Sequence, residues 1–140
     1  MFSRSTEYGI RALVYLARQP AGKPCGALEI AEAEKIPMPF LWKILQDLTR
    51  KKLLRSSRGV RGGYALAKPA SSVTIAEILK RTKSLGTLER CILGYRQCRD
   101  SNACVLHERW VAVRNELMHA FTETTLADAA RKPARKRKRR

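Results

Sequence analysis

The feature that most restricts the fold is a glycine-rich segment that follows three helical patterns. Gly59, Gly62 and Gly63 fall within five residues, between two short runs at 53–56 and 64–67 that are expected to be extended. Glycine accepts the positive φ values that a tight hairpin tip requires. The sequence therefore predicts a two-stranded antiparallel hairpin that follows a helical unit and packs against it.

Three helices are predicted before this hairpin, at 4–19, 27–35 and 39–51, because apolar residues recur there at helical spacing. Pro20 ends the first helix, and Pro39 opens the third after a turn at 36–39. The residues expected on the three buried faces are, in chain order, Ile10, Leu13, Val14 and Ala17; Leu28 and Ala31; and Leu41, Ile44, Leu45 and Leu48.

Three helices followed by a hairpin is the element order of a winged helix-turn-helix, in which the third helix enters the DNA major groove. An arginine on a thin hairpin can enter the minor groove or contact phosphates. The candidate DNA-contacting residues are Pro39, Trp42, Lys43, Arg50, Arg58 and Arg61. Two alternatives stay open: Trp42 could instead pack against the hairpin, and the same element order occurs in protein-interaction modules.

The charge of the chain favours a polyanionic partner. The net charge is +17, and residues 131–140 contribute eight Lys or Arg and no acid. The other 130 residues hold 21 basic and 12 acidic residues, so they are basic without the tail. Double-stranded DNA is the expected partner. The tail is interpreted as a disordered basic arm that strengthens DNA attraction or only improves solubility.

Soft metal ligands cluster near the C-terminal third. Cys91, Cys98, Cys104 and His107 are separated by six, five and two residues. Structural zinc sites usually have shorter spacings within each ligand pair, whereas wide loops between thiolates suit an iron–sulfur cluster. Zinc, or a thiol redox switch without metal, remains an alternative. Cys25 stands alone and is expected to be a small, semi-buried residue.

The rest of the chain is predicted to be mostly helical. Thr74 and Glu77 form a capping-box pattern ahead of a helix at 75–83, and 84–104 is a loop. A long helix follows, with a short one at 126–130. The long helix carries a heptad-like stripe, which favours pairing with a second copy: Leu106, Trp110, Val113, Leu117 and Ala120.

The expected class is therefore mostly α with a small β-hairpin wing. The predicted organisation is a winged helix-turn-helix domain at 1–83, a cysteine-rich loop at 84–104, dimerisation and terminal helices at 105–130, and a basic tail at 131–140. No signal peptide or membrane-spanning run is recognised, so we expect a cytoplasmic protein whose thiols stay reduced.

Several motifs occur together: EYGIRAL (7–13), IP (36–37), LWKIL (41–45), RGVRGGY (58–64), KPAS (68–71) and the three-cysteine loop. In combination they resemble the Rrf-type family of winged helix-turn-helix transcription regulators, which includes IscR-, NsrR- and RirA-like proteins. The resemblance covers about residues 1–130. It implies a homodimer that binds a palindromic operator through the third helix and the wing, and that acts as a repressor of transcription.

The resemblance also implies ligands for an iron–sulfur cluster, namely Cys91, Cys98 and Cys104. For the fourth ligand, His107 matches the IscR-like branch, which holds a 2Fe–2S cluster. Glu7 matches the nitric-oxide-sensing branch, in which the partner subunit supplies an acidic ligand to a 4Fe–4S cluster. We favour His107 because it lies in the same segment as the cysteines. Arg58 matches the wing arginine of the family.

The chain departs from the IscR-like pattern at two places. The gap between the first two cysteines is six residues rather than five, and Pro39 and Trp42 replace a polar residue and a glutamate that discriminates bases. An enzyme is not expected, because the sequence lacks a Ser–His–Asp set and a phosphate-binding glycine loop, and Glu108 is the only acid beside the ligands that could act as a base. The sequence therefore predicts a cluster-containing regulator that senses iron–sulfur status, redox state or nitric oxide.

Overall fold

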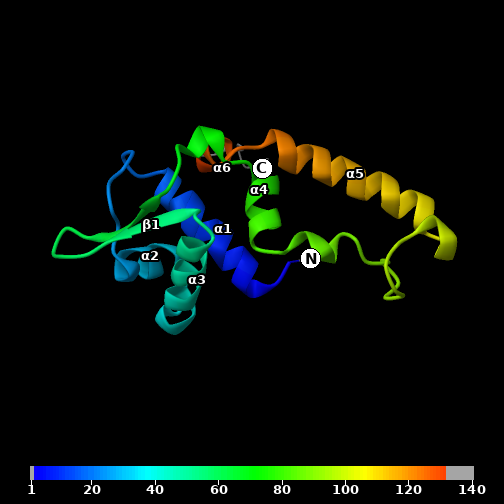
Figure 1. Cartoon of the computed structure of the whole chain (residues 1–140), viewed down its shortest axis with the longest axis horizontal. Coiled ribbons are helices and arrows are strands. Elements are labelled where there is room, and N and C mark those ends of the chain that lie inside the picture. The colour runs from blue at the N-terminus through cyan, green and yellow to red at the C-terminus, as the bar shows by residue number, and fades with distance from the viewer. Residues whose placement is uncertain (1, 132–140) are drawn as a thin grey trace, which may run out of the picture.

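The computed structural model describes residues 2–131, so most of the predicted basic tail lies outside the described residues (Figure 1). Three short 3₁₀ turns, η1 (Ala70–Ser72), η2 (Leu85–Thr87) and η3 (Asp100–Asn102), join the main elements. The helices and strands are α1 (Arg4–Ala17), α2 (Ala27–Glu34), α3 (Met38–Arg50), β1 (Leu54–Ser57), β2 (Gly63–Leu66), α4 (Ile75–Arg81), α5 (His107–Glu123) and α6 (Leu126–Ala130).

Helices α1, α2 and α3 and the β1–β2 hairpin form one unit, with α1 packed against both α2 and α3. Local signals define the helix ends. Ser3 caps α1 by accepting the Thr6 N–H at 3.2 Å, and Lys35 ends α2 in the left-handed region, at φ 53°. Pro37 precedes α3, whose first residue is Met38, so Pro39 is the second helical residue rather than the first. The predicted winged helix-turn-helix architecture is confirmed.

The buried faces of two helices differ from the predicted ones. In α1 the fully buried positions are Gly9, Ala12, Leu13 and Leu16, and the remaining predicted apolar residues are only partly buried. In α2 the buried residues are Ile30 and Ala31, whereas Leu28 is 59% exposed. Because Ala27, Ile30 and Ala31 share one face at i, i+3 and i+4 spacing, Leu28 lies about a third of a turn away from it. The stripe predicted for α3 is confirmed.

The wing is a four-residue antiparallel pairing of β1 and β2, in which Leu54 faces Leu66 and Ser57 faces Gly63. A backbone bridge ties the start of β2 to the loop before α2, because Cys25 and Tyr64 exchange N–H···O bonds of 2.9 and 2.8 Å. Gly63 has φ +145°, and a Cβ there would lie 2.4 Å from the Cys25 carbonyl oxygen. Only glycine fits at this position.

Replacing Gly63 with alanine is therefore expected to destabilise the fold by more than about 1 kcal/mol, because a side chain meets both backbone and an unfavourable φ. Urea unfolding followed by circular dichroism measures the change. Gly86→Ala is the matched control, since no atom lies within 4 Å of a Cβ at that position. Equal unfolding midpoints for the two variants would contradict this account of the wing.

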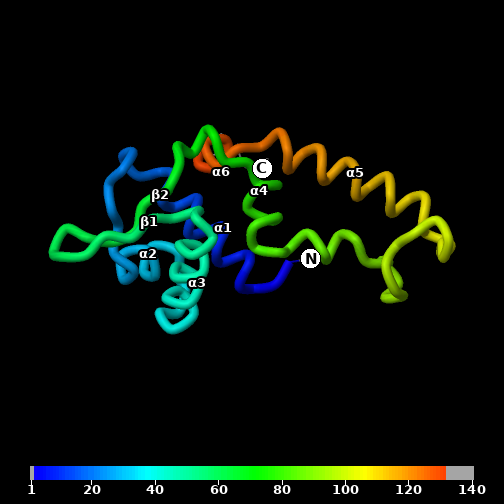
Figure 2. Tube along the Cα trace, in the orientation of Figure 1, coloured from blue at the N-terminus to red at the C-terminus, as the bar shows by residue number. Residues whose placement is uncertain are grey.

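The second half of the chain leaves this unit and returns to it. Figure 2 shows the chain running outward through the 84–104 loop and back along α5, so that α6 lies beside α1. Leu126 is fully buried, and its N–H donates to the Val73 carbonyl at 2.8 Å. Between these ends, α5 buries only His107 among its residues, and Val113 on the predicted stripe is 51% exposed.

The predicted capping box of α4 is only half formed. Thr74 accepts the Glu77 N–H at 3.1 Å, but the Glu77 carboxylate does not return to the cap. It lies 2.8 Å from Arg81 and 3.6 Å from Lys68 instead, because two cations are within its reach. Within the described range, no helix has the length and apolar character needed to cross a membrane.

Candidate functional site

The four predicted ligands form two separate close pairs. The sulfur atoms of Cys91 and Cys104 lie 3.7 Å apart, and the Cys98 sulfur lies 3.1 Å from Nδ1 of His107. Cys91 and His107 are each 8% exposed. An isolated antiparallel bridge joins Arg90 to Gln97 and closes the first part of the loop. Cys91 and Cys98 each directly follow one of the two bridged residues.

The turn that follows Cys91 affects the acidity of its thiol. The Leu93 amide is the main cause of a lowered pKa for the Cys91 thiol, followed by the contact with Cys104 and the amides of Tyr95 and Gly94. Burial acts in the opposite direction. The Gly94 N–H donates to the Cys91 carbonyl oxygen at 3.0 Å, and the φ of +84° at Gly94 allows this tight turn beside the sulfur. The arrangement favours a thiolate, which is the form that binds metals.

Asp100 orients the histidine. Its carboxylate accepts a hydrogen bond from Nε2 of His107 at 2.8 Å. Nδ1 is then the nitrogen that faces Cys98 and is able to accept a proton or bind a metal. Carboxylates that hold the second nitrogen of a ligating histidine are common in metal sites. Sequence reasoning missed Asp100, since an acid in an irregular loop has no spacing that links it to the histidine.

The spacing of Cys91 and Cys104 is that of two ligands of one metal ion. Two thiolates on one tetrahedral metal lie about 3.8 Å apart when each metal–sulfur bond is about 2.3 Å, and the Cys91–Cys104 distance is 3.7 Å. Across residues 2–131, no group of three or more His, Cys, Asp or Glu side chains is placed to hold a single ion. A single zinc ion would need four donors around one point, which the two pairs do not provide.

Glu7 lies apart from these pairs. It is exposed in the first turn of α1, and Figure 1 shows the start of α1 well separated from the loop that leads into α5. One chain therefore does not bring Glu7 to the cysteines. Its predicted role as a ligand from a partner subunit stays a prediction. Cys25 is fully buried beside the wing, whereas the sequence predicted a semi-buried residue. Like Glu7, it lies apart from the cysteine loop at 84–104.

The predicted DNA-contacting residues lie on two neighbouring elements. Pro39, Trp42, Lys43 and Arg50 lie on the exposed face of α3, and the Trp42 side chain is 56% exposed rather than packed into the hairpin. Arg50 forms an ion pair of 3.0 Å with Asp47, which also binds Lys51. Asp47 therefore offsets part of the positive charge at this end of α3.

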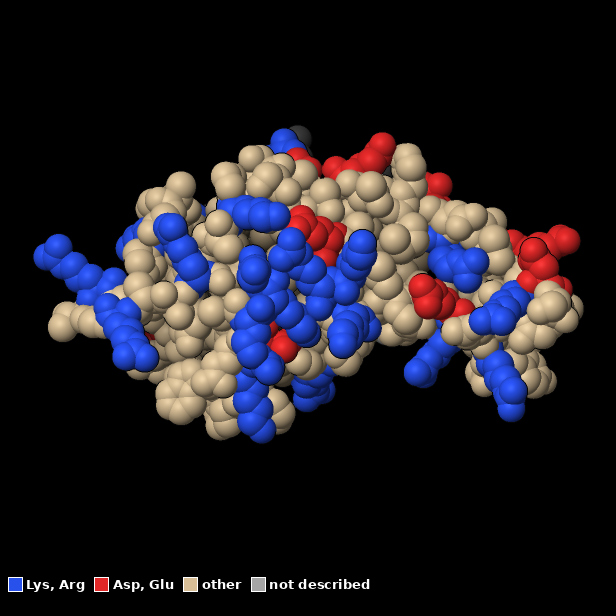
Figure 3. Space-filling model, in the orientation of Figure 1, with Lys and Arg blue, Asp and Glu red and all other residues tan. Residues whose placement is uncertain are grey.

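The wing carries the other two predicted contacts. Arg58 and Arg61 are exposed around the tip, where Val60 also projects fully into solvent. Figure 3 shows basic groups on the wing and in a band over the middle of the molecule, whereas acidic groups gather mainly toward the α5 side. The segment 84–123, referred to below as the arm, carries basic groups as well, but there they are mixed with acidic ones.

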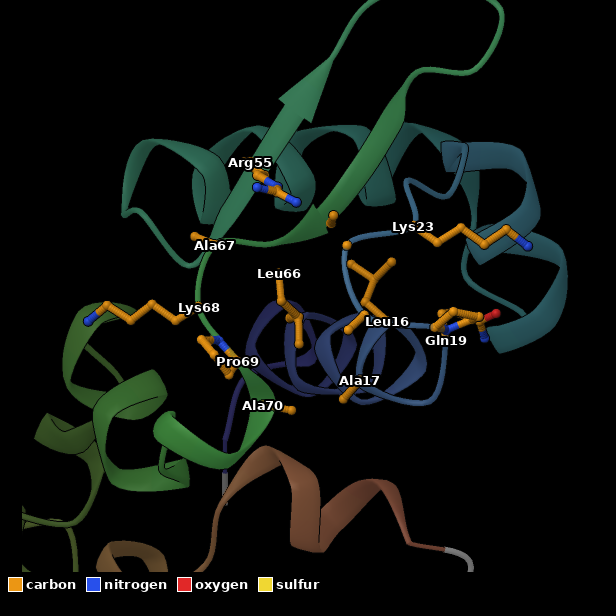
Figure 4. Close-up of a pocket in the computed structure, with 14 residues that line it drawn as sticks. Leu16, Ala17, Gln19, Lys23, Arg55, Leu66, Ala67, Lys68, Pro69 and Ala70 are labelled. Atoms are coloured by element: carbon orange, nitrogen blue, oxygen red, sulfur yellow. The ribbon is translucent and has the colours of Figure 1, made fainter.

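A separate hollow lies between the end of α1 and the base of the wing (Figure 4). Its volume is about 290 Å³, and its wall is apolar, with Leu16, Leu66 and Pro69 among the lining residues. Lys23 and Lys68 extend away from its centre in Figure 4. None of the predicted ligands or DNA-contacting residues lines it, so it belongs to neither candidate site.

Comparisons with known proteins agree with this architecture. Residues 2–132 match the Rrf2 family, described as iron-dependent transcriptional regulators. A helix-turn-helix transcriptional regulator from Aquifex aeolicus is 32% identical over 130 residues, covering 91% of this chain and 90% of the relative. A second regulator of this type, Rv1287 from Mycobacterium tuberculosis, is 36% identical over 138 residues, covering 91% of this chain and 80% of the relative.

Two solved structures show the same fold. CymR, the global cysteine regulator of B. subtilis, superposes with a TM-score of 0.77 at 22% identity, over 93% of this chain and 95% of its own. IscR from T. potens has a TM-score of 0.71 at 23% identity, over 92% of this chain and 85% of its own. The resemblance inferred from the motifs is thus confirmed, and the chain belongs to the Rrf2 family of DNA-binding transcription regulators.

Proposed function

We propose that the protein is a cytoplasmic, homodimeric regulator, acting as a repressor, that holds an iron–sulfur cluster and binds a palindromic DNA operator. Cys91, Cys98, Cys104 and His107 would be the cluster ligands. Residues of α3 and the wing, including Lys43, Arg58 and Arg61, would contact the operator. The observation that carries the cluster assignment is the arrangement of the four ligands in two close pairs.

A 2Fe–2S cluster fits two pairs because each of its irons takes two protein ligands. One pair here is two cysteines and the other is a cysteine with a histidine. Such a cluster supplies one-electron redox chemistry and sensitivity to oxidants when bound. The chain contributes the Cys91 thiol, whose pKa is lowered, and the histidine orientation set by Asp100. A 4Fe–4S cluster with Glu7 of a second copy as fourth ligand is the alternative.

The dimer assignment rests on α5. Its apolar stripe is left largely uncovered by the described part of the chain, with Leu106 37% and Val113 51% exposed. A second copy of α5 would cover this stripe. Two recognition helices related by a twofold axis then match half-sites about 34–36 Å apart. Because the cysteine loop leads directly into α5, cluster occupancy would alter the position of α5 and hence the half-site spacing that the dimer accepts.

The second candidate is a cluster-free regulator switched by cysteine oxidation. The Cys91 and Cys104 sulfurs, 3.7 Å apart, would need to approach by less than 2 Å to form a disulfide. Zinc binding is less favoured, since the four donors do not converge on one point.

The decisive experiment is purification without oxygen, followed by iron and sulfide analysis and operator binding at fixed salt. Operators come from in vitro selection with the full chain, and fluorescence anisotropy compares cluster-bound and apo protein. We expect coloured protein and an affinity difference of about 5- to 150-fold between the two forms. Equal affinities would refute cluster sensing. Colourless protein that fails reconstitution would favour the thiol switch.

A further inference from the structure

Two large apolar side chains are exposed at the start of the recognition helix. Phe40 is 60% and Trp42 56% exposed, although the same helix buries Leu41 and Leu45 completely. Leu41 lies between them, so the two rings leave α3 on opposite flanks of the buried stripe, about 200° apart around the helix. Figure 3 shows an uncharged surface at the lower end of the helical unit, where α3 begins, with basic groups beside it. Large exposed apolar groups of this kind mark interaction sites.

The exposed side chains in this part of α3 have few hydrogen-bonding groups. Pro39 and Phe40 have no polar side-chain atom, Trp42 has only its indole N–H, and Lys43 adds a single ammonium. Pro39, Phe40 and Trp42 therefore cannot distinguish bases by a pair of hydrogen bonds. The remaining means of direct readout in the major groove is apolar contact with the C5-methyl group of thymine, a contact that phenylalanine makes.

The surrounding charge identifies the occupant as DNA. On α3, Lys43 directly follows Trp42 and Arg50 is the last residue of the helix, whereas Arg58 and Arg61 lie between the two strands of the wing. A second copy of this basic unit would be repelled, whereas the phosphates of a duplex would be attracted. Gln46 lies one turn after Trp42, at i+4 on the same side of α3, and glutamine pairs with adenine through two hydrogen bonds. Aromatic rings and glutamine together favour A·T pairs.

We propose that Trp42 and Phe40 read thymine methyl groups, so that each operator half-site contains A·T pairs recognised through those methyls. This inference rests on the proposed operator binding and specifies its ligand. Trp42 and Phe40 are the residues that determine specificity at these positions, whereas Lys43 and the wing arginines mainly fix the position of the protein on the phosphates.

Deoxyuridine substitution tests the proposal, because it removes only the methyl group of thymine. Each thymine of an operator selected with the full chain is replaced singly, and anisotropy gives the affinity at fixed salt. One or two thymines per half-site are expected to show about fourfold weaker binding, equivalent to about 0.8 kcal/mol for one buried carbon group. The variants Trp42→Ala and Phe40→Ala each lack one ring. For each variant, replacing the thymine that this ring contacted with deoxyuridine is expected to leave the affinity unchanged.

Leu28→Ala is the matched control, since Leu28 is as exposed as the two rings but lies on α2. This variant is expected to keep the full sensitivity to deoxyuridine. If sequence-specific binding is found but no thymine is sensitive, or if both ring variants keep the sensitivity, the proposal is wrong and operator binding stands. If selection enriches no sequence, the proposed operator binding fails as well.

Discussion

Replacing Cys91 with alanine is expected to abolish the iron and acid-labile sulfide of protein purified without oxygen. Cys91 is nearly buried and lies 3.7 Å from Cys104, and the backbone amides of the following turn, Leu93 above all, lower the pKa of its thiol. No other thiol is placed to replace it, since Cys25 lies in the core beside the wing. Visible absorbance together with iron and sulfide per chain measures the loss.

The matched control is Cys25→Ala, which removes a thiol of the same kind outside the loop. The bonds that join Cys25 to Tyr64 are backbone bonds and survive this change. We expect Cys25→Ala to keep the full iron content. Comparing His107→Ala with Glu7→Ala then identifies the fourth ligand. Wild-type iron and sulfide in Cys91→Ala would contradict the assignment of the loop as the cluster site.

Spacing predicted the helices better than it predicted their buried faces. The i, i+3, i+4, i+7 stripe of α3 is confirmed because large aliphatic residues occupy all four positions. In α1 the buried face includes Gly9 and Ala12, since α1 packs against three other helices and small residues allow close approach. A hydropathy pattern gives such small residues little weight. The observed face is therefore rotated relative to the predicted one.

The composition of the candidate cluster site was predictable, but its geometry was not. Three cysteines and a histidine in one loop are visible in the sequence. Which cysteine pairs with which depends on the turn at Gly94 and the bridge from Arg90 to Gln97, and irregular backbone has no periodic signal. Asp100 and Phe40 were missed for different reasons. Asp100 lies in an irregular turn, and Phe40 was indistinguishable in sequence from a core residue.

The largest effect on stability is expected from Leu126→Ala, at about 2–5 kcal/mol. Leu126 is fully buried where α6 packs against α1, and its N–H bonds to Val73. This contact fixes the end of α5 to the DNA-binding unit, so the cavity weakens the attachment of the whole arm. Urea unfolding at one protein concentration measures the change, because dimer stability depends on concentration.

Leu28→Ala provides the same substitution at an exposed site, since Leu28 is 59% exposed on α2. Its free energy of unfolding is expected to stay within about 0.5 kcal/mol of the wild type. If the two leucine variants unfold at the same midpoint, α6 does not anchor the arm as the packing indicates. If only Leu126→Ala loses much of its free energy of unfolding, the five-residue helix α6 joins the predicted dimerisation helix α5 to the DNA-binding unit. Movement of the cysteine loop could then reach the recognition helix through a rigid connection.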